Sequence, residues 1–225
     1  MTLYLKAGPD RSSPGDCPFA QYVRMVLEEK GLEYQLRPCA SNDDKPAWLL
    51  DHYEGKMPAL RHKADCYVES DVIAQYLDFF FQPDSLTSKK KFMAEANEII
   101  DGFFPAFAKY AKHTPDGDDD DKGLKEGLEK KLAEFQAHLS KEDRTGPWFV
   151  GDGQQFTLLD CSLAPKLYHL KTCLEAFKGN TIDLVSDYPK LSEYMDAAFA
   201  RPSFKKSACP TEYVTWGWDN ARSKM

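Results

Sequence analysis

The sequence predicts a chain of two parts, a small α/β unit followed by an all-helical one. Segments with strand and helix character alternate as far as residue 81, which is typical of one sheet with helices beside it. From residue 89 onward the apolar residues recur at helical spacing. A short polar segment containing a proline separates the two, so we expect a domain over 1–81, a linker over 82–88 and an all-helical domain over 89–225.

Composition limits the classes of protein to which the chain can belong. It has 225 residues, of which 42% are hydrophobic, which is enough for a large core. Its net charge of −7 argues against a nucleic-acid partner, because neutralising phosphates requires clustered Lys and Arg. No apolar run reaches the roughly eighteen residues of a membrane-spanning helix, so we expect no membrane partner.

The six cysteines and five histidines suggest neither a disulfide framework nor a metal site. The cysteines form no C-x-x-C pair, and the histidines show no metal-ligand spacing. No signal peptide is recognisable, so we expect reduced thiols in a cytoplasmic protein. A transit peptide for an organelle, removed before Met1, is left open.

The first part is predicted to begin with a short strand at Leu3–Leu5 and a turn-rich link from Gly8 to Gly15. An amphipathic helix follows from Pro18 and stops at Gly31. The remaining expected elements are a strand over 34–37, a short helix begun by Pro46, a hairpin of 59–61 with 66–68, and a helix with Ser70 at its N-cap.

Cys17 is the candidate catalytic residue. Pro18 suits the first position of a helix, which puts Cys17 at the N-cap or one residue before it. There the sulfur faces unpaired N–H groups and the positive end of the helix dipole, which favour thiolate over thiol. We therefore expect a lowered pKa and a nucleophilic sulfur.

The position three residues after Cys17 also carries information. A dithiol redox motif has a second cysteine there, whereas this chain has Ala20. A disulfide formed at Cys17 must therefore be resolved by another thiol, and glutathione is the abundant intracellular candidate. The alternative is that Cys17 is a small apolar residue without chemistry.

The second part is predicted to be helical throughout. Phe92 to Phe107 reads as one helical run with a kink at Pro105, and 116–121 as a solvated acidic loop rather than a calcium site. The other expected features are a helix over 124–139, a capping box at Thr157–Asp160 that opens a helix through Leu170, a helix begun by Pro189, and an aromatic tail, 213–218, that packs back.

Together these features resemble the glutathione transferase superfamily, with a thioredoxin-like N-terminal domain and an all-α C-terminal domain. Within it the sequence is similar to the plant-type dehydroascorbate reductases. The segments that carry this resemblance are Gly15–Phe19, Asp44–Trp48, Glu69–Ile73, Leu163–Leu170 and Glu212–Val214.

The resemblance implies roles for several residues in binding glutathione. Pro58 resembles the cis-proline of thioredoxin-like domains, and Met57 before it would offer its backbone to the cysteine of glutathione. Glu69 and Ser70 resemble the pair that holds the γ-glutamyl group. Lys45 would pair with the glycyl carboxylate, or else be a surface lysine. Trp218 would cover the site, although a packed tail aromatic is the simpler interpretation.

The resemblance also implies that Asp16 and Lys6 contact the second substrate. Asp16 could bind enediol hydroxyls as ascorbate forms, or it could be a helix-capping residue. Lys6 could stabilise a developing enediolate, or it could be an exposed lysine at the end of a strand. The implied reaction consumes dehydroascorbate and two glutathione molecules and yields ascorbate and glutathione disulfide, with no bound cofactor and no metal.

Three functions are compatible with these residues. The first is an enzyme, a monomeric dehydroascorbate reductase that works by a ping-pong mechanism. The second is a glutathione-dependent thioltransferase of the omega type. The third is a non-enzymatic protein similar to the chloride intracellular channels, against which stands the lack of a strongly apolar N-terminal segment.

Overall fold

The computed structural model describes residues 1–81, 85–116 and 121–223. Contacts within the chain divide it into two compact units. The first unit consists of Met1–Ser85 with Arg201–Val214, and the second of Leu86–Ala200 with Thr215–Met225. The linker expected at 82–88 has residues 82–84 outside the described part, and the acidic loop expected at 116–121 has 117–120 outside it.

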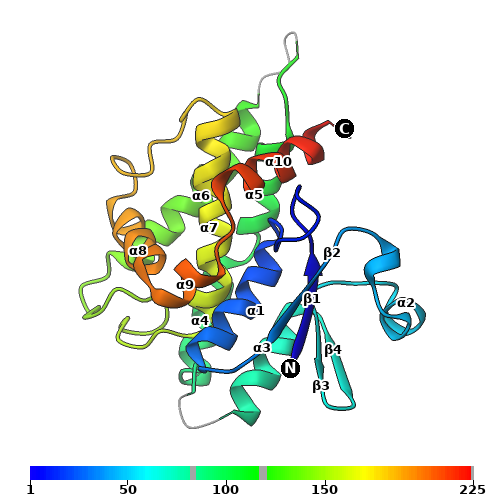
Figure 1. Ribbon diagram of the computed structural model, residues 1–225. Coiled ribbons are helices and arrows are strands. Elements are labelled where there is room, and N and C mark those ends of the chain that lie inside the picture. The colour runs from blue at the N-terminus through cyan, green and yellow to red at the C-terminus, as the bar shows by residue number, and fades with distance from the viewer. Residues whose placement is uncertain (82–84, 117–120, 224–225) are drawn as a thin grey trace. The chain divides into compact units, whose positions relative to one another are not determined.

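The first unit is built on one four-stranded sheet (Figure 1). Its strands are β1 (Thr2–Lys6), β2 (Gln35–Cys39), β3 (Ala59–His62) and β4 (Asp65–Val68), in the order β2-β1-β3-β4. β1 runs parallel to β2 and antiparallel to β3, and β3 and β4 form the expected hairpin. The sheet is therefore mixed, with the N-terminal strand in its interior.

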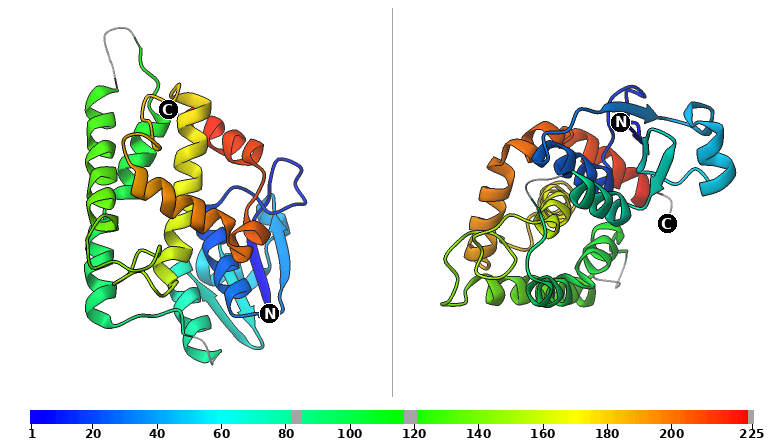
Figure 2. Two further views of the ribbon diagram at one scale, coloured as in Figure 1. Left: turned by 90° about the vertical axis from the view of Figure 1, so that its left-hand side faces the viewer. Right: turned by 90° about the horizontal axis from the view of Figure 1, so that it is seen from below.

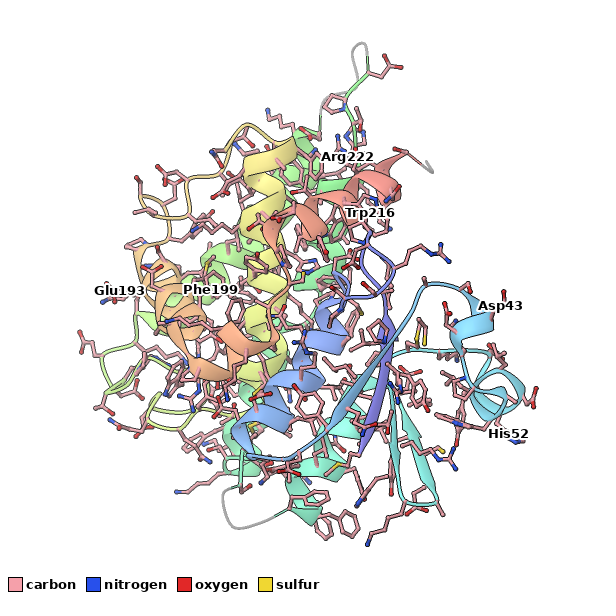
Figure 3. The ribbon with its side chains drawn as sticks, in the orientation of Figure 1. Asp43, His52, Glu193, Phe199, Trp216 and Arg222 are labelled. Atoms are coloured by element: carbon pink, nitrogen blue, oxygen red, sulfur yellow. The ribbon has the colours of Figure 1, made fainter. Side chains whose placement is uncertain are left out.

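Helices cover both faces of this sheet. α1 (Pro18–Glu29) and α3 (Ser70–Phe80) lie on one side, and α2 (Ala47–Tyr53) lies on the other with the 3₁₀ turn η1 (Asn42–Asp44), as Figures 1 and 2 show. Asp43 in η1 and His52 in α2, labelled in Figure 3, mark that second side. Burial on both faces explains why Leu3, Leu5 and Leu60 have at most 1% of their surface exposed.

A short helix from late in the sequence completes the first unit. α9 (Pro202–Ser207) packs on α1, where the buried Arg24 donates to the carbonyl oxygen of Ser207 at 2.5 Å. Arg201 makes a two-pronged ion pair with Glu29 at 2.6 and 2.7 Å. Nothing in the local sequence around either segment indicates this pairing, because it joins residues more than 170 positions apart.

The strand directions bring several loops to one edge of the sheet. Tyr4 pairs with Ala59, and Ala59 pairs with Val68. Because these pairs are antiparallel, the segment after β1, the segment before β3 and the segment after β4 leave the sheet at the same edge. The segment after β2 joins them, since β2 is parallel to β1. Most of the predicted site residues lie in these four segments.

The second unit is helical in its described part. It contains α4 (Lys90–Ile100), α5 (Phe103–Lys112), α6 (Lys122–Leu139), α7 (Leu158–Phe177), α8 (Pro189–Ala200) and most of α10 (Thr211–Arg222). α7 is the core helix and packs against α4, α5 and α8. Phe199 of α8, labelled in Figure 3, meets Tyr168 of α7 edge-on at 5.9 Å between ring centres.

The capping box predicted for α7 is confirmed. Thr157 is the N-cap, and the Asp160 carboxylate accepts hydrogen bonds from the Thr157 N–H at 2.8 Å and hydroxyl at 2.9 Å. It also accepts one from the Phe149 N–H at 2.8 Å. Asp160 is fully buried, so this cluster ties the start of α7 to the segment before it.

Two predicted details are wrong. The run from Phe92 to Phe107 is not one kinked helix, because it breaks at Gly102, whose φ of 74° lies in the left-handed region that glycine tolerates. Pro105 falls in the first turn of α5, where a missing N–H needs no partner. In addition, Ser70 is the first residue of α3 and Glu69 is its N-cap, with no side-chain capping bond.

Candidate functional site

Cys17 is the N-cap of α1, and Pro18 is the first residue of that helix. The side chain is half-buried, and like the other five cysteines it is not part of a disulfide. The N–H groups of Phe19 and Ala20 face the sulfur, although no capping hydrogen bond is completed. The geometry expected from the sequence is therefore present, with a single sulfur at the positive end of a helix.

The pKa of the Cys17 thiol does not follow the expectation. Burial raises it above its ordinary value, and this effect exceeds the lowering by the N–H groups of Ala20 and Phe19. The Asp16 carboxylate raises it further, while the Lys6 ammonium lowers it. The sequence shows the helix start but not the loss of water around the sulfur, and for that reason the predicted direction was wrong.

Lys6 and Asp16 form an ion pair beside the cysteine. The Lys6 Nζ lies 2.8 Å from an Asp16 carboxylate oxygen. Lys6 ends β1, and Asp16 immediately precedes Cys17, so the pair spans the two ends of the β1–α1 loop. Asp16 is not the cap of α1, since Cys17 occupies that position. The two residues expected to contact the second substrate are thus brought together.

A cavity of about 370 Å³ in the first unit contains most of the residues expected to bind glutathione. It is lined by the segment before β3 (Lys56, Met57, Pro58), the start of α3 (Glu69, Ser70, Asp71) and Phe19 of α1. The Met57–Pro58 bond is cis, as the resemblance implies. Phe19 connects the cavity with Cys17, which stands two residues earlier at the start of the same helix.

Glu69 and Ser70 form an uncapped helix start on this cavity. Ser70 is buried, and the side chain of Glu69, the N-cap residue, makes no capping hydrogen bond to the first N–H groups of α3. Those N–H groups and the hydroxyl suit a carboxylate ligand. Glu69 has a φ of 67°, an unfavourable conformation for a residue with a side chain, and such conformations are concentrated at ligand sites.

Lys45 follows η1 at the same edge of the sheet. Its Nζ lies 2.9 Å from the point that a Cβ on Gly55 would occupy, so the ammonium rests against the turn that precedes Lys56 and Met57. This places a positive charge next to the segment that lines the cavity. Its role in binding a carboxylate stays a prediction.

Trp218 belongs to the second unit and is buried there. Its indole N–H donates to Nδ1 of His169 at 3.0 Å, and its ring meets Phe107 at 5.0 Å between ring centres. Trp218 thus packs within the second unit, as part of α10, a helix for which the sequence analysis gave no bounds. A role for Trp218 in covering the glutathione site stays a prediction.

The sequence analysis assigned no role to Phe19, Lys56 and Asp71. Each is adjacent in sequence, or nearly so, to a residue that it did single out, and this proximity is the signal that could have found them. Among the described residues no group of three or more His, Cys, Asp or Glu side chains could hold a metal ion. In the same part of the chain no helix is both long enough and apolar enough to cross a membrane.

Comparison with known proteins fits this arrangement. The family model of the glutathione S-transferase N-terminal domain matches residues 15–83, and that of the C-terminal domain matches residues 93–197. The probable cytosolic glutathione S-transferase DHAR1 of Oryza sativa subsp. japonica is 34% identical over 91% of this chain and 89% of its own length. The chain therefore belongs to the glutathione S-transferase family, with a thioredoxin-like first domain.

Further similarities point to one branch of that family. The chloroplastic glutathione S-transferase DHAR3 of Arabidopsis thaliana is 31% identical over 91% of this chain and 73% of its own length. The crystal structure of Chlamydomonas reinhardtii dehydroascorbate reductase is 32% identical and superposes with a TM-score of 0.78. That superposition covers 98% of this chain and 97% of the other.

Proposed function

We propose that the protein reduces dehydroascorbate to ascorbate with glutathione as the electron donor. The observation that carries the proposal is Cys17 at the N-cap of α1 with Ala20 three residues later, a single sulfur without a resolving partner in its motif. Full-length similarity to a protein named dehydroascorbate reductase supports the choice of substrate.

Glutathione binds in the cavity beside Cys17 under this proposal. Its γ-glutamyl carboxylate meets the uncapped start of α3 at Glu69 and Ser70, and its cysteine backbone pairs with Met57 before Pro58. Lys45 attracts the glycyl carboxylate. The cavity joins the start of α3 to the backbone before β3, an arrangement that suits a short peptide with carboxylates at both ends.

The reaction proceeds in three steps that balance in electrons. The Cys17 thiolate adds to a carbonyl carbon of dehydroascorbate and forms a C–S bond. A glutathione thiolate then attacks the Cys17 sulfur, and the electron pair of the C–S bond passes to the sugar acid, which leaves as the enediolate of ascorbate. A second glutathione thiolate attacks the glutathione sulfur of the mixed disulfide, which releases glutathione disulfide and restores Cys17.

The residues around Cys17 supply charge at the right steps. The N–H groups of Phe19 and Ala20 stabilise the sulfur while it is ionised. Lys6 stabilises the negative enediolate, and Asp16 binds its hydroxyl groups. Burial raises the pKa of Cys17, and a thiolate of higher pKa is the stronger nucleophile.

The test compares two substrates. Purified protein with glutathione is expected to form ascorbate from dehydroascorbate faster than it reduces a small glutathione mixed disulfide, with parallel reciprocal plots when both substrates are varied. Faster turnover of the mixed disulfide would replace the proposal with a thioltransferase of the omega type. No turnover of either would leave a binding protein. The cytoplasm as the compartment stays a prediction.

A further inference from the structure

The loop between β1 and α1 carries Asp16 and leads into Cys17, and its shape is set at its base. The Gly15 N–H donates to the Lys6 carbonyl oxygen at 2.8 Å, and Ala7 forms a bridge with Pro14. Gly15 approaches Ala7 so closely that a Cβ would lie 2.6 Å from the Ala7 carbonyl oxygen. The ends of the loop are therefore held together, and the Lys6–Asp16 ion pair closes them.

The tip of the loop is folded around Asp10. Its carboxylate accepts hydrogen bonds from the N–H groups of Ser12 at 3.0 Å and Ser13 at 2.9 Å. The Gly8 N–H donates to the Ser13 carbonyl oxygen at 2.8 Å. Through these contacts the position of the tip and that of the base depend on each other.

Tyr213 holds this tip from a distant part of the sequence. It lies in the segment Arg201–Val214, which belongs to the same compact unit as the loop. A Cβ on Gly8 would lie 2.5 Å from Cε2 of Tyr213, so the ring covers the Gly8 backbone directly. The Tyr213 hydroxyl also lies near the side chains of Asp10 and Ser13, and desolvation and the Asp10 carboxylate both raise the pKa of that hydroxyl.

We propose that Tyr213 is a positioning residue that fixes the β1–α1 loop, and through it the place of the Lys6–Asp16 pair beside Cys17. The ring and the hydroxyl act on two different points of the tip, Gly8 and Asp10. Both points belong to the tip of the loop, which is tied to its base by the hydrogen bond from the Gly8 N–H to the Ser13 carbonyl oxygen, so Tyr213 acts through the backbone of the loop. The proposal rests on the proposed function only where it concerns dehydroascorbate.

The charged and titratable groups near this loop come from both packed segments. Asp16 and Lys6 act on Cys17 from the loop itself. Cys209 and Glu212 lie in the segment that carries Tyr213. Burial raises the pKa of the Cys209 thiol, and the charges of Asp16 and Glu212 both raise it further. Moving Asp16 should therefore change the pKa of Cys17. The pH dependence of Cys17 alkylation measures that change.

Three variants test the proposal. Tyr213→Phe removes the hydroxyl and keeps the ring, Tyr213→Leu removes both, and Gly8→Ala displaces the ring from the side of the loop. Tyr34→Phe is the matched control, since it removes a 2.8 Å hydrogen bond from tyrosine to Glu28 in the same unit but outside the loop. Each variant is examined by the pH profile of Cys17 alkylation, mapped by peptide mass, and by KM and kcat.

We expect Tyr213→Leu and Gly8→Ala to shift the alkylation profile to lower pH, in the direction of Asp16→Asn, because Asp16 raises the pKa of Cys17 more than Lys6 lowers it. KM for dehydroascorbate should rise about tenfold, the size of one hydrogen bond, and KM for glutathione less than about threefold. Tyr213→Phe should lie between wild type and Tyr213→Leu. Combining Gly8→Ala with Tyr213→Leu should add little.

Unchanged profiles and KM values in Tyr213→Phe and Gly8→Ala would overturn the proposal, even if Tyr213→Leu failed to fold. Equal effects in Tyr34→Phe would also overturn it, because they would show a general loss of stability in the first unit and not a specific effect on the loop. If wild-type protein did not reduce dehydroascorbate, the proposed function would fail, while the alkylation profiles would still decide the role of Tyr213.

Discussion

The buried carboxylate of Asp160 gives the sharpest prediction for the stability of the second unit. It accepts four hydrogen bonds, from the Thr157 N–H and hydroxyl, the Phe149 N–H and the Tyr194 hydroxyl, at 2.8 to 3.2 Å. Asp160→Asn keeps one oxygen and turns the other into an NH₂ group, so two of the four bonds are lost. At about 1.5–3 kcal/mol for each bond to a charged group, the loss is about 3–6 kcal/mol.

A second effect works in the opposite direction. Burial raises the pKa of Asp160, which means that the ionised carboxylate is costly to bury, and asparagine removes that cost. We therefore expect the lower end of the range, about 3 kcal/mol less free energy of unfolding. The measurement is chemical denaturation followed by far-UV circular dichroism, with attention to the transition of the helical unit.

Asp183→Asn is the matched control. The Asp183 carboxylate accepts three hydrogen bonds, from the Val185 and Ser186 N–H groups and the Ser186 hydroxyl, but it is exposed to water. Its replacement should cost less than about 1 kcal/mol, because water can take over the lost contacts. An equal loss in both variants would refute the reasoning, since burial rather than the number of bonds is expected to decide the size of the effect.

Three further predictions concern the site and the assembly. Because burial raises the pKa of Cys17, alkylation by iodoacetamide should accelerate as the pH rises above neutrality. Asp16→Asn should shift that pH profile to lower pH, and Lys6→Met should shift it to higher pH. Shifts in the reverse directions would contradict the effects assigned to these two charges. Ser70→Ala should weaken glutathione binding by about 10- to 150-fold in calorimetry, the size of one hydrogen bond to a charged carboxylate, whereas the exposed Ser186→Ala should leave it unchanged. Light scattering should give the monomer mass of 25.6 kDa at micromolar concentration, and twice that mass would rule the monomer out.

Local chemistry in the sequence was sufficient for the features that depend on neighbouring residues. Proline lacks an N–H and fits the first position of a helix, which located Cys17 at the start of α1. The three-residue spacing of Thr157 and Asp160 likewise located the start of α7. The hairpin of β3 and β4 followed from two apolar segments around a polar turn.

Features that depend on distant residues could not be predicted in the same way. The packing of α9 on α1 rests on the carbonyl oxygen of Ser207 meeting Arg24, and main-chain carbonyls carry no sequence signal. The contact of Tyr213 with Gly8 could not be predicted either. A glycine in a turn does not indicate whether it is needed for its backbone conformation or for the close approach of another side chain. The raised pKa of Cys17 depends on how much water the folded chain excludes, which the helix start alone does not reveal.

The break at Gly102 shows a third kind of difference. Apolar residues kept the helical spacing from Phe92 to Phe107, since both α4 and α5 bury a face in the same unit. Periodicity therefore continued across a point where the backbone turns. The proline led to a predicted kink at position 105, whereas the boundary between α4 and α5 lies at Gly102, three residues earlier.

The proposed reaction requires Cys17 to be the only catalytic thiol, and one measurement tests this most directly. Protein treated with glutathione disulfide is analysed by intact mass and peptide mapping, beside Cys17→Ser and the control Cys66→Ser, which removes a half-buried thiol in β4. We predict a single glutathione adduct at Cys17 in wild type and in Cys66→Ser. Cys17→Ser should show no adduct and no reduction of dehydroascorbate, because serine is not ionised near neutral pH. An adduct confined to Cys39, Cys66 or Cys209, or a Cys17→Ser variant that keeps most of its activity, would contradict the account.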